Sequence, residues 1–375
     1  MLEIKQTPMG GNITAFLDVV SAIYKGDPYY VRPLDMDLGD RLNPKKNPFF
    51  QHGEGTIFTA HKQGRCVGRI TAQIDREHLD RYKDATGFFG FFDTMNDPVV
   101  SSALLGRAES WLRDRGMRVS QGPMSLCINE ETGCLIEGFN SRPFVMMPHH
   151  HPYQGELIEA SGYAKAKDLF AWRYDVGELN SRTKRAREDI RSLPNVTSRP
   201  LAMAHITRDV ETMVDIFNDA WNENWGFVPM TQPEVHKLAY EFKLILIPEL
   251  TRLVSIDGEP AAVAIAIPNL NEMIYDLNGK LFPLGLPKLL YRLKVVGPKS
   301  ARLILLGIRK KYRAIRKYAP LASYLYAEMN DATKKRGITL GELSWTLEDN
   351  SAVNAGIRLM GAQLYKKYRV YSKSI

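Results

Sequence analysis

Hydrophobic and polar residues alternate with two different periods along this chain, and the segments with each period come in the same order in both halves. A period near 3.6 residues predicts amphipathic helices, and a period of two predicts half-buried strands. In the first half, Gly64 separates two strand-like runs, and Asp97-Pro98 opens a helix. The elements predicted there are a helix at 13–26, strands at 55–63 and 66–75, an apolar run at 88–94, a helix from Asp97 to Gly116, a strand at 117–123, a helix at 154–163 and a strand at 167–175.

The second half repeats this arrangement: two helices, a group of strands, and then alternating helices and strands. The predicted helices are 209–225, 231–245, 321–337 and 350–368, and the predicted strands are 251–257, 261–268, 271–278, 301–308, 338–347 and 369–373. Two copies of one ordering predict a tandem repeat of an α/β domain with a mixed sheet. We expect an N-terminal domain at 1–177, a charged and partly helical connector at 178–200, and a C-terminal domain at 201–375 that carries an insert at 280–300.

The composition fits a folded protein of two domains. The chain has 375 residues, of which 44% are hydrophobic and 25% charged. Its three cysteines form no paired framework and no zinc-clip spacing, so we expect a reducing compartment and no metal. The sequence contains no signal-peptide pattern and no run of about 18 apolar residues. We therefore expect a soluble, cytoplasmic protein.

Positive charge is concentrated in one segment. Residues 280–320 contain twelve Lys or Arg and no Asp or Glu, while the net charge of the whole chain is only +8. Such asymmetry indicates an anionic partner. Leucines alternate with the cations of the insert, and Pro283 and Pro287 exclude a long helix. Apolar side chains beside cations are typical of a segment that lies on an anionic membrane, and 280–317 is the predicted contact. A helix that covers its own core remains the alternative, and nucleic acid fits poorly because leucines outnumber aromatic residues.

Three stretches carry a family resemblance. LEDNSAVNAGIRLMGAQLYKKYRVYSK (347–373) resembles the closing pattern of the GCN5-related N-acetyltransferase (GNAT) superfamily. Residues 122–175 and 217–234 are similar to a bacterial family of tandem acetyltransferase-fold proteins that includes the bacterial ceramide synthases. The resemblance implies an acyl-CoA-dependent N-acyltransferase that acts on a long-chain, sphingoid-type amine. Acyl-CoA would be a co-substrate, and no cofactor would be bound permanently.

In the superfamily, a glycine-rich turn after the fourth strand binds the pyrophosphate of CoA. Here the corresponding segment, GIRKKYRAIRKYAP (307–320), has cations where glycines are expected. Cationic side chains can reach phosphate directly. The predicted CoA contacts are Arg309, Lys311, Arg313, Arg316 and Asn350. A solvated basic turn and a relocated CoA site are the alternatives.

Three residues are candidates for acid and base chemistry. The resemblance implies that Tyr365, placed near the end of a helix, protonates the departing thiolate, with Tyr368 as a rival and a packing role as the alternative. Glu342, on the strand before that helix, is a candidate base for the attacking amine. His150, within the triplet 149–151, is a second candidate, because imidazole titrates near neutral pH.

Four residues in the family-like stretches are candidates for holding the amine substrate: Asn129, Glu130, Glu223 and Trp225. Trp221 and Trp225 are four residues apart, which predicts one helical face, and core packing is the alternative there. The prediction as a whole is a membrane-surface N-acyltransferase of bacterial ceramide synthesis, peripheral to the inner face of the cytoplasmic membrane. Its rivals are a transferase for a soluble amine, an aminoacyl-tRNA-dependent transferase, and a non-catalytic membrane scaffold.

Overall fold

The chain forms two compact units, and neither is one continuous stretch of sequence. The computed structural model describes the backbone of residues 1–375 and all side chains except those of Phe242 and Leu244. Unit 1 comprises Met1–Phe170, Met273–Arg292 and Lys366–Ile375, and unit 2 comprises Ala171–Glu272 and Leu293–Tyr365. These units differ from the predicted contiguous boundaries in the insert and at the C-terminus. The boundaries of the two sequence copies, 1–177 and 201–375, stay a prediction.

Unit 1 holds the first run of elements and the C-terminal end of the last strand. Strands β7 and β13 contain residues of both units, as do the short helices α9 and η4. The elements with residues in unit 1 are β1 (Leu2–Pro8), α1 (Thr14–Ile23), α2 (Asp35–Arg41), η1 (Pro48–Gln51), β2 (Gly53–Lys62), β3 (Arg65–Asp75), α3 (Arg76–Tyr82), β4 (Thr86–Thr94), α4 (Pro98–Arg113), β5 (Val119–Gly122), β6 (Cys134–Glu137), α5 (Pro152–Ala160), β7 (Ala164–Asp175), α9 (Asn271–Ile274), α10 (Gly285–Tyr291), η4 (Arg292–Val296) and β13 (Gln363–Ser374).

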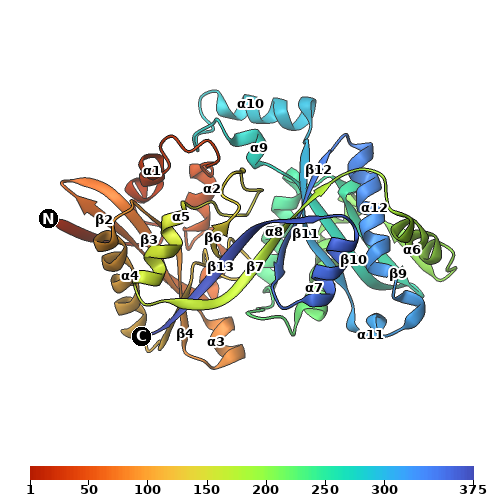
Figure 1. Ribbon diagram of the computed structural model, residues 1–375, viewed down its shortest axis with the longest axis horizontal. Coiled ribbons are helices and arrows are strands. Elements are labelled where there is room, and N and C mark those ends of the chain that lie inside the picture. The colour runs from red at the N-terminus through yellow and green to blue at the C-terminus, as the bar shows by residue number, and fades with distance from the viewer. The chain divides into compact units, whose positions relative to one another are not determined.

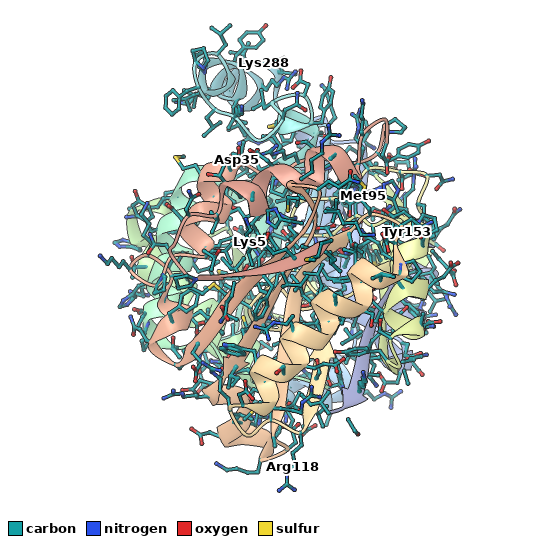
Figure 2. The ribbon with its side chains drawn as sticks, turned by 90° about the vertical axis from the view of Figure 1, so that its left-hand side faces the viewer. Lys5, Asp35, Met95, Arg118, Tyr153 and Lys288 are labelled. Carbon is teal, nitrogen blue, oxygen red and sulfur yellow. The ribbon has the colours of Figure 1, made fainter. Side chains whose placement is uncertain are left out.

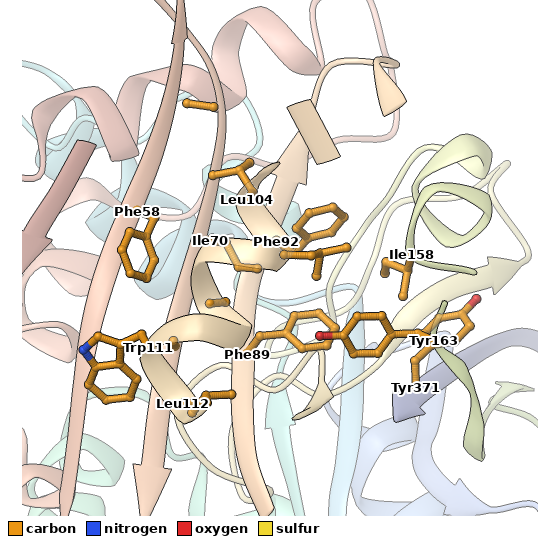
Figure 3. Close-up of a cluster of buried hydrophobic side chains, with 14 of the residues drawn as sticks. Phe58, Ile70, Phe89, Phe92, Leu104, Trp111, Leu112, Ile158, Tyr163 and Tyr371 are labelled. Atoms are coloured by element: carbon orange, nitrogen blue, oxygen red, sulfur yellow. The ribbon is translucent and has the colours of Figure 1, made fainter. Parts of the chain in front are cut away.

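The core of unit 1 lies between its sheet and helix α4. Strands β1 to β4 pair antiparallel, β4 and β5 pair parallel, and the C-terminal part of β13 pairs with β5. Figure 3 shows Phe89, Leu104 and Leu112 packed together with Tyr371, and all four side chains are buried. Burying each of these aliphatic or aromatic side chains stabilises the fold by roughly 1.5–3 kcal/mol. Asp97 begins α4 as predicted, because its carboxylate accepts the N–H groups of the first turn.

Unit 2 contains the remaining elements. They are α6 (Ser181–Arg191), β8 (Val196–Arg199), η2 (Met203–His205), α7 (Ile206–Trp221), α8 (Gln232–Ile245), η3 (Pro248–Leu250), β9 (Thr251–Ile256), β10 (Glu259–Pro268), β11 (Ser300–Ile308), α11 (Lys310–Arg313), η5 (Arg316–Tyr318), α12 (Leu321–Lys335), β12 (Leu340–Leu347) and α13 (Ser351–Leu359).

Helices cover both faces of the unit 2 sheet. Strands β8 to β11 pair antiparallel in sequence order, and β12 pairs parallel with β11. Leu306 and Ile308 pack into the cluster that includes α12, whereas Gly307 between them faces Ile216 and Ala220 of α7. Since successive strand residues point to opposite faces, α12 and α7 lie on opposite sides. Figure 1 shows α6 beside α12, and ion pairs join Arg187 to Asp331 (2.5 Å) and Arg191 to Glu328 (2.6 Å).

The structure corrects two predicted elements. The apolar pattern predicts a strand at 271–278, but Asn271–Ile274 form helix α9 and a turn follows. The helix predicted at 350–368 ends at Leu359, because Gly361 adopts a positive φ, and strand β13 begins at Gln363. The segment predicted as a partly helical connector, 178–200, contains α6, which packs on α12 within unit 2, and its role as a connector stays a prediction. Strands β1, β6 and β8 and helices α2 and α3 carry too little periodicity to be predicted.

The insert packs on unit 1. Ile274, Leu277 and Leu281 form a buried cluster with Val31, and Leu286 and Leu289 of α10 pack against it. The carbonyl of Gly279 accepts the N–H of Asp35 at 2.9 Å. Figure 2 shows the helix that carries Lys288 standing out beyond the start of α2 at Asp35. No helix in the described part of the chain is long and apolar enough to span a bilayer.

Candidate active site

Strands β11 and β12 of unit 2 separate shortly after they begin to pair. Their parallel pairing runs from Ser300↔Leu340 to Leu303↔Leu343 and then ends. On the other side of β11, the register with β10 shifts between Ile265 and Ala266. Such a bulge bends a strand and increases its twist, which explains why β11 turns away from β12 at this point. The result is an opening between two parallel strands.

A buried hydrogen-bonded chain lies beside this opening. Arg302 and Glu342 are register partners, so their side chains share the face opposite α12. The Nε of Arg302 donates to the Oγ of Ser344 at 2.8 Å, and the Ser344 hydroxyl donates to Oε1 of Glu342 at 2.5 Å. The guanidinium of Arg302 is 3.6 Å from the Glu342 carboxylate. All three side chains are less than 10% exposed. The enclosed carboxylate thus has a cation and a hydroxyl donor beside it.

Tyr365 completes this chain, although not from the predicted helix. It lies on β13 and is half-buried, and its hydroxyl donates to Oε2 of Glu342. Helix α13 contains no tyrosine, so the helical position predicted for Tyr365 is wrong. Its rival Tyr368 is fully buried in unit 1. The structure therefore brings together Glu342 and Tyr365, the two residues that the sequence put forward as base and acid.

The basic segment after β11 is tied to acidic side chains of unit 2. Arg309 pairs with Asp215, and Lys311 pairs with Glu259. The carboxylate of Glu259 raises the pKa of the Lys311 ammonium through their hydrogen bond. Arg313 instead donates to the carbonyls of Ile308 (2.8 Å) and Ala220 (2.7 Å). Arg309 and Lys311 line a hollow with Asp219, Glu259 and Pro260, whereas Arg316 is exposed. The segment is a charged network, in which Arg316 projects into solvent.

Asn350 caps a helix. Its side chain accepts the N–H of Val353 at 3.3 Å at the start of α13. A cap of this kind is worth about 1 kcal/mol. The predicted contact of Asn350 with CoA stays a prediction, and the structure adds this local role.

The corresponding place in unit 1 is filled by its own chain. Strands β4 and β5 also pair in parallel for three residues, from Thr86↔Val119 to Phe88↔Gln121. Beyond them, the N–H of Met124 donates to the Phe89 carbonyl (2.8 Å), and Gln73 donates to the Met124 carbonyl (2.6 Å). A Cβ added to Gly90 would lie 2.0 Å from that carbonyl oxygen. The described residues of unit 1 therefore leave no corresponding opening between β4 and β5.

The histidine triplet lies in unit 1 and is enclosed. Nδ1 of His150 accepts the N–H of Leu135 at 3.1 Å, and burial lowers the pKa of this imidazole to about 4. His149 contacts Asp27 at 2.9 Å, and burial lowers the pKa of His149 as well. A neutral imidazole whose Nδ1 is occupied serves the fold of unit 1. The catalytic role of His150 stays a prediction.

The four predicted substrate contacts fall in different units. Glu130 of unit 1 forms an ion pair with the buried Arg41 (2.5 Å), and Asn129 is its neighbour in the chain. Glu223 of unit 2 pairs with Lys310 (2.6 Å). Helix α7 ends at Trp221, so Trp225 lies outside it, and the single helical face predicted for these two tryptophans is wrong. Both carboxylates already have cationic partners.

Sequence reasoning missed Arg302 and Ser344. Arg302 is the only charged residue within the apolar run 301–308, and an arginine inside a strand indicates a buried carboxylate partner. That signal was available, because Glu342 lies in the next strand of the same βαβ unit. No comparable signal marked Ser344.

A mixed sheet in which two parallel strands separate beside a carboxylate and a tyrosine is typical of the GNAT fold. A tandem GNAT protein from the clavulanic acid biosynthesis pathway superposes with a TM-score of 0.58 at 12% identity, covering 100% of this chain and 98% of that chain. A GCN5-related N-acetyltransferase from Sphaerobacter thermophilus gives 0.57 at 13% identity, covering 100% and 95%. These likenesses confirm the predicted fold, two tandem domains of this type. No family model matches the chain.

Sequence relatives narrow the class. The bacterial ceramide synthase of Caulobacter vibrioides is 41% identical over 365 residues, which cover 96% of this chain and 94% of that protein. Protein YghO of Escherichia coli is 39% identical over 366 residues, covering 97% and 93%. The chain belongs to the bacterial ceramide synthase family, and it is an acyltransferase, as predicted.

Proposed function

We propose that this protein transfers a fatty acyl group from acyl-CoA to the amine of a long-chain, sphingoid-type base, and so forms a ceramide in bacterial sphingolipid synthesis. The observation that carries the proposal is the pairing of Glu342 with Tyr365 beside the opening between β11 and β12. The substrates are proposed from the similarity to the bacterial ceramide synthase of Caulobacter vibrioides. The thioester would lie in the opening, and backbone N–H groups along the parted strands would hydrogen-bond to it.

The paired side chains can move the proton that amide formation releases. The neutral amine attacks the thioester carbonyl, the C–N bond forms, and the C–S bond breaks. Glu342 takes the proton from the amine nitrogen, and Tyr365 gives its own proton to the departing thiolate and recovers one from Glu342 through their hydrogen bond. Arg302 and Ser344 hold the carboxylate in place. The products are an amide and free CoA, without a metal or covalent intermediate.

Cations after β11 would bind the phosphates of CoA. Arg309, Lys311, Arg313 and Arg316 follow the strand that forms one side of the opening, and charged hydrogen bonds to phosphate are strong. Asp215 and Glu259 already neutralise two of these cations. Phosphate would therefore have to compete with those carboxylates, or bind first to the exposed Arg316.

Residues 280–317 would bind anionic lipids at the inner face of the cytoplasmic membrane. Phe282 and Leu284 are 70% and 76% exposed, and Leu290 and Tyr291 are exposed as well. Lys280 and Lys294 are exposed in the same segment, which has no acidic residue. Apolar side chains can enter the acyl region while cations, worth about 1 kcal/mol each, remain at the headgroups. A surface location would give access to a lipid amine.

A product assay tests the proposed reaction. The purified protein is incubated with palmitoyl-CoA or acetyl-CoA and a sphingoid base, and the amide is measured by mass spectrometry. We expect product from palmitoyl-CoA and a fall of about 10²–10⁴-fold in Glu342→Gln. The matched control, Glu188→Gln, removes an exposed carboxylate of α6 and should retain activity. Equal use of acetyl-CoA, or transfer only to a soluble amine or through aminoacyl-tRNA, would contradict the proposal. Vesicle binding without thiol release would indicate a scaffold.

A further inference from the structure

Ser344 is the middle member of the buried chain beside the opening. It lies on β12 just after Leu343, the last residue of that strand that pairs with β11. The hydroxyl oxygen of Ser344 accepts Nε of Arg302 at 2.8 Å, and the Ser344 carbonyl accepts Nη2 of Arg302 at 3.3 Å. The hydroxyl hydrogen is donated to Oε1 of Glu342 at 2.5 Å. The arginine therefore holds Ser344 by both its side chain and its backbone.

The direction of these hydrogen bonds follows from the chemistry of the groups. A guanidinium has only donors, so the Ser344 hydroxyl oxygen must be the acceptor in its contact with Arg302. A hydroxyl has one hydrogen, and Oε1 of Glu342 is the acceptor that receives it. Because Ser344 is only 6% exposed, solvent has little access to this hydrogen. Oε1 of Glu342 is thus an acceptor in this network.

The Oε1 atom is an unfavourable place for a proton. A hydrogen on Oε1 would have to point either at the Ser344 hydroxyl or toward the Arg302 guanidinium, whose Nε is 3.6 Å away. In the first case, the Ser344 hydroxyl hydrogen would lose its acceptor in a buried place, which is costly. In the second case, the new hydrogen would face a cation that has only donors. A proton on Glu342 is therefore more stable on the other carboxylate oxygen.

That other oxygen, Oε2 of Glu342, contacts Tyr365. The tyrosine hydroxyl donates to Oε2, and Tyr365 is half-buried, whereas the other three members of the chain are buried. The two oxygens of one carboxylate therefore have different neighbours. Oε1 contacts a hydroxyl and a guanidinium, which keep their protons at neutral pH, and Oε2 contacts a phenol, which can pass a proton on.

We propose that Ser344 is a positioning residue, which excludes the transferred proton from Oε1 of Glu342 and so keeps it on Oε2, beside Tyr365. The inference rests on the proposed function and deepens it, because that reaction requires a proton on Glu342 that Tyr365 can recover. The amine nitrogen gives its proton to Oε2 as the C–N bond forms. When the C–S bond breaks, Tyr365 gives its proton to sulfur, and the proton on Oε2 passes to the phenolate oxygen. Glu342 ends as a carboxylate, and Ser344 and Arg302 gain and lose no proton.

The pH profile of kcat/KM tests the proposal, with CoA release followed as free thiol. In Ser344→Ala, the Glu342 carboxylate loses a donor, so it takes up a proton at a higher pH. The acid limb of the profile should therefore move to higher pH by about one pH unit, and kcat should fall about tenfold, because Oε1 can then hold the proton. Ser344→Thr keeps the hydroxyl and should retain the wild-type profile. Ser344→Cys, whose thiol is a weaker donor, should lie between these two variants.

A control and a double variant separate this role from packing. Ser102→Ala, at an exposed serine of α4, should keep the wild-type profile. Adding Ser344→Ala to Tyr365→Phe should lower kcat less than Ser344→Ala does alone, because the proton on Oε2 then has no tyrosine oxygen to return to. An unmoved acid limb in both Ser344→Ala and Ser344→Cys, or the same loss of kcat in both backgrounds, would overturn the proposal.

Thiol release and product mass separate this inference from the proposed function. If ceramide forms but the acid limb does not move, only the role of Ser344 is wrong. If CoA is released with a soluble amine and no amide forms on a sphingoid base, the proposed acceptor is wrong, and the acid limb measured with the soluble amine still decides the role of Ser344. If the wild type releases no CoA with any amine, both are overturned.

Discussion

At the scale of single residues, Glu342 and Tyr365 are joined by a hydrogen bond, and this pairing gives a sharp expectation. We expect Tyr365→Phe to lower kcat about 10²-fold or more, because the thiolate loses its proton donor. Since the two residues would act as one relay, the double variant Glu342→Gln/Tyr365→Phe should be no slower than the slower single variant. Steady-state kinetics measure this.

Tyr240→Phe is the matched control, because Tyr240 is 68% exposed on α8. Multiplicative losses in the double variant would show that the two side chains act independently. Full activity of Tyr365→Phe would remove Tyr365 from the reaction.

The burial of His150 leads us to expect that the free energy of unfolding depends on pH. Burial lowers its pKa from 6.5 to about 4 in the folded protein. Below pH 6.5 the unfolded chain takes up a proton at this imidazole, and the folded protein does so only near pH 4. The free energy of unfolding should therefore fall as the pH drops through this window, by up to about 3 kcal/mol. Denaturant unfolding at about pH 7 and about pH 5, on either side of the ordinary imidazole pKa, measures the change.

In His150→Asn, this pH-dependent loss should shrink, because Asn does not titrate and can still accept the N–H of Leu135. His205→Asn, at an exposed histidine, should keep the wild-type dependence. An unchanged slope in His150→Asn would show that other groups dominate the acid response.

For the candidate site, the sequence alone indicated which residue types to consider better than it indicated their positions. Glu342 and Tyr365 were identified by residue type and by the family resemblance. Their contact depends on the return of β13 past β12, and no local pattern encodes that pairing. For Glu130 and Glu223, charge suggested a role toward an ammonium, but Arg41 and Lys310, distant in sequence, already neutralise them. A partner far away in the chain decides whether a charged residue is available.

At the scale of elements, the segment after β11 should bind CoA phosphates in competition with its own carboxylates. We expect Lys311→Met to raise the KM for acyl-CoA about tenfold through loss of a charged contact. Glu259→Gln should lower it, because the Lys311 ammonium is released from its ion pair. Lys335→Met, at the exposed end of α12, is the control. A rise in KM in Glu259→Gln would mean that this ion pair supports the loop.

Helix α10 and its preceding turn should determine membrane binding. Phe282→Ser/Leu284→Ser removes two exposed apolar side chains, and we expect vesicle partitioning to fall about 100-fold or more. Sedimentation with phosphatidylserine-containing vesicles measures this. Val99→Ser, at a position 63% exposed on α4, should bind as the wild type does. Equal binding of the double variant, or equal binding of the wild type to neutral vesicles, would contradict the membrane contact through 280–317.

Elements with strong periodicity or clear caps were predictable. Asp97-Pro98 marked the start of α4, and strand-like runs separated by turns at Gly64 and Gly258 marked β2, β3, β9 and β10. The error at 271–278 has a physical cause: the apolar residues Met273, Ile274 and Leu277 fit a strand, but Ile274 and Leu277 pack from a helical turn against Val31. Short apolar runs do not distinguish strand from buried helix, and tertiary contacts decide.

At the scale of the whole molecule, the end of the chain completes unit 1. Tyr371 is 1% exposed in the main core of that unit, which Figure 3 shows. Tyr371→Ala should lower the free energy of unfolding by about 3–5 kcal/mol. Tyr240→Ala should change it little, and thermal or denaturant unfolding compares the two. A small loss in Tyr371→Ala would show that the core of unit 1 closes without the C-terminal strand.

The sequence by itself determined the repeated α/β order, the mixed-sheet fold, the enzyme class and the positions of charge, because these follow from periodicity, composition and motif. The tertiary structure decided which segments form each unit, which carboxylates are neutralised, and where an opening remains between parallel strands. These features depend on contacts between residues far apart in the sequence. In unit 1, Gln73 holds the Met124 carbonyl where an opening would otherwise lie, and in unit 2 a β-bulge between β10 and β11 lets the strands part.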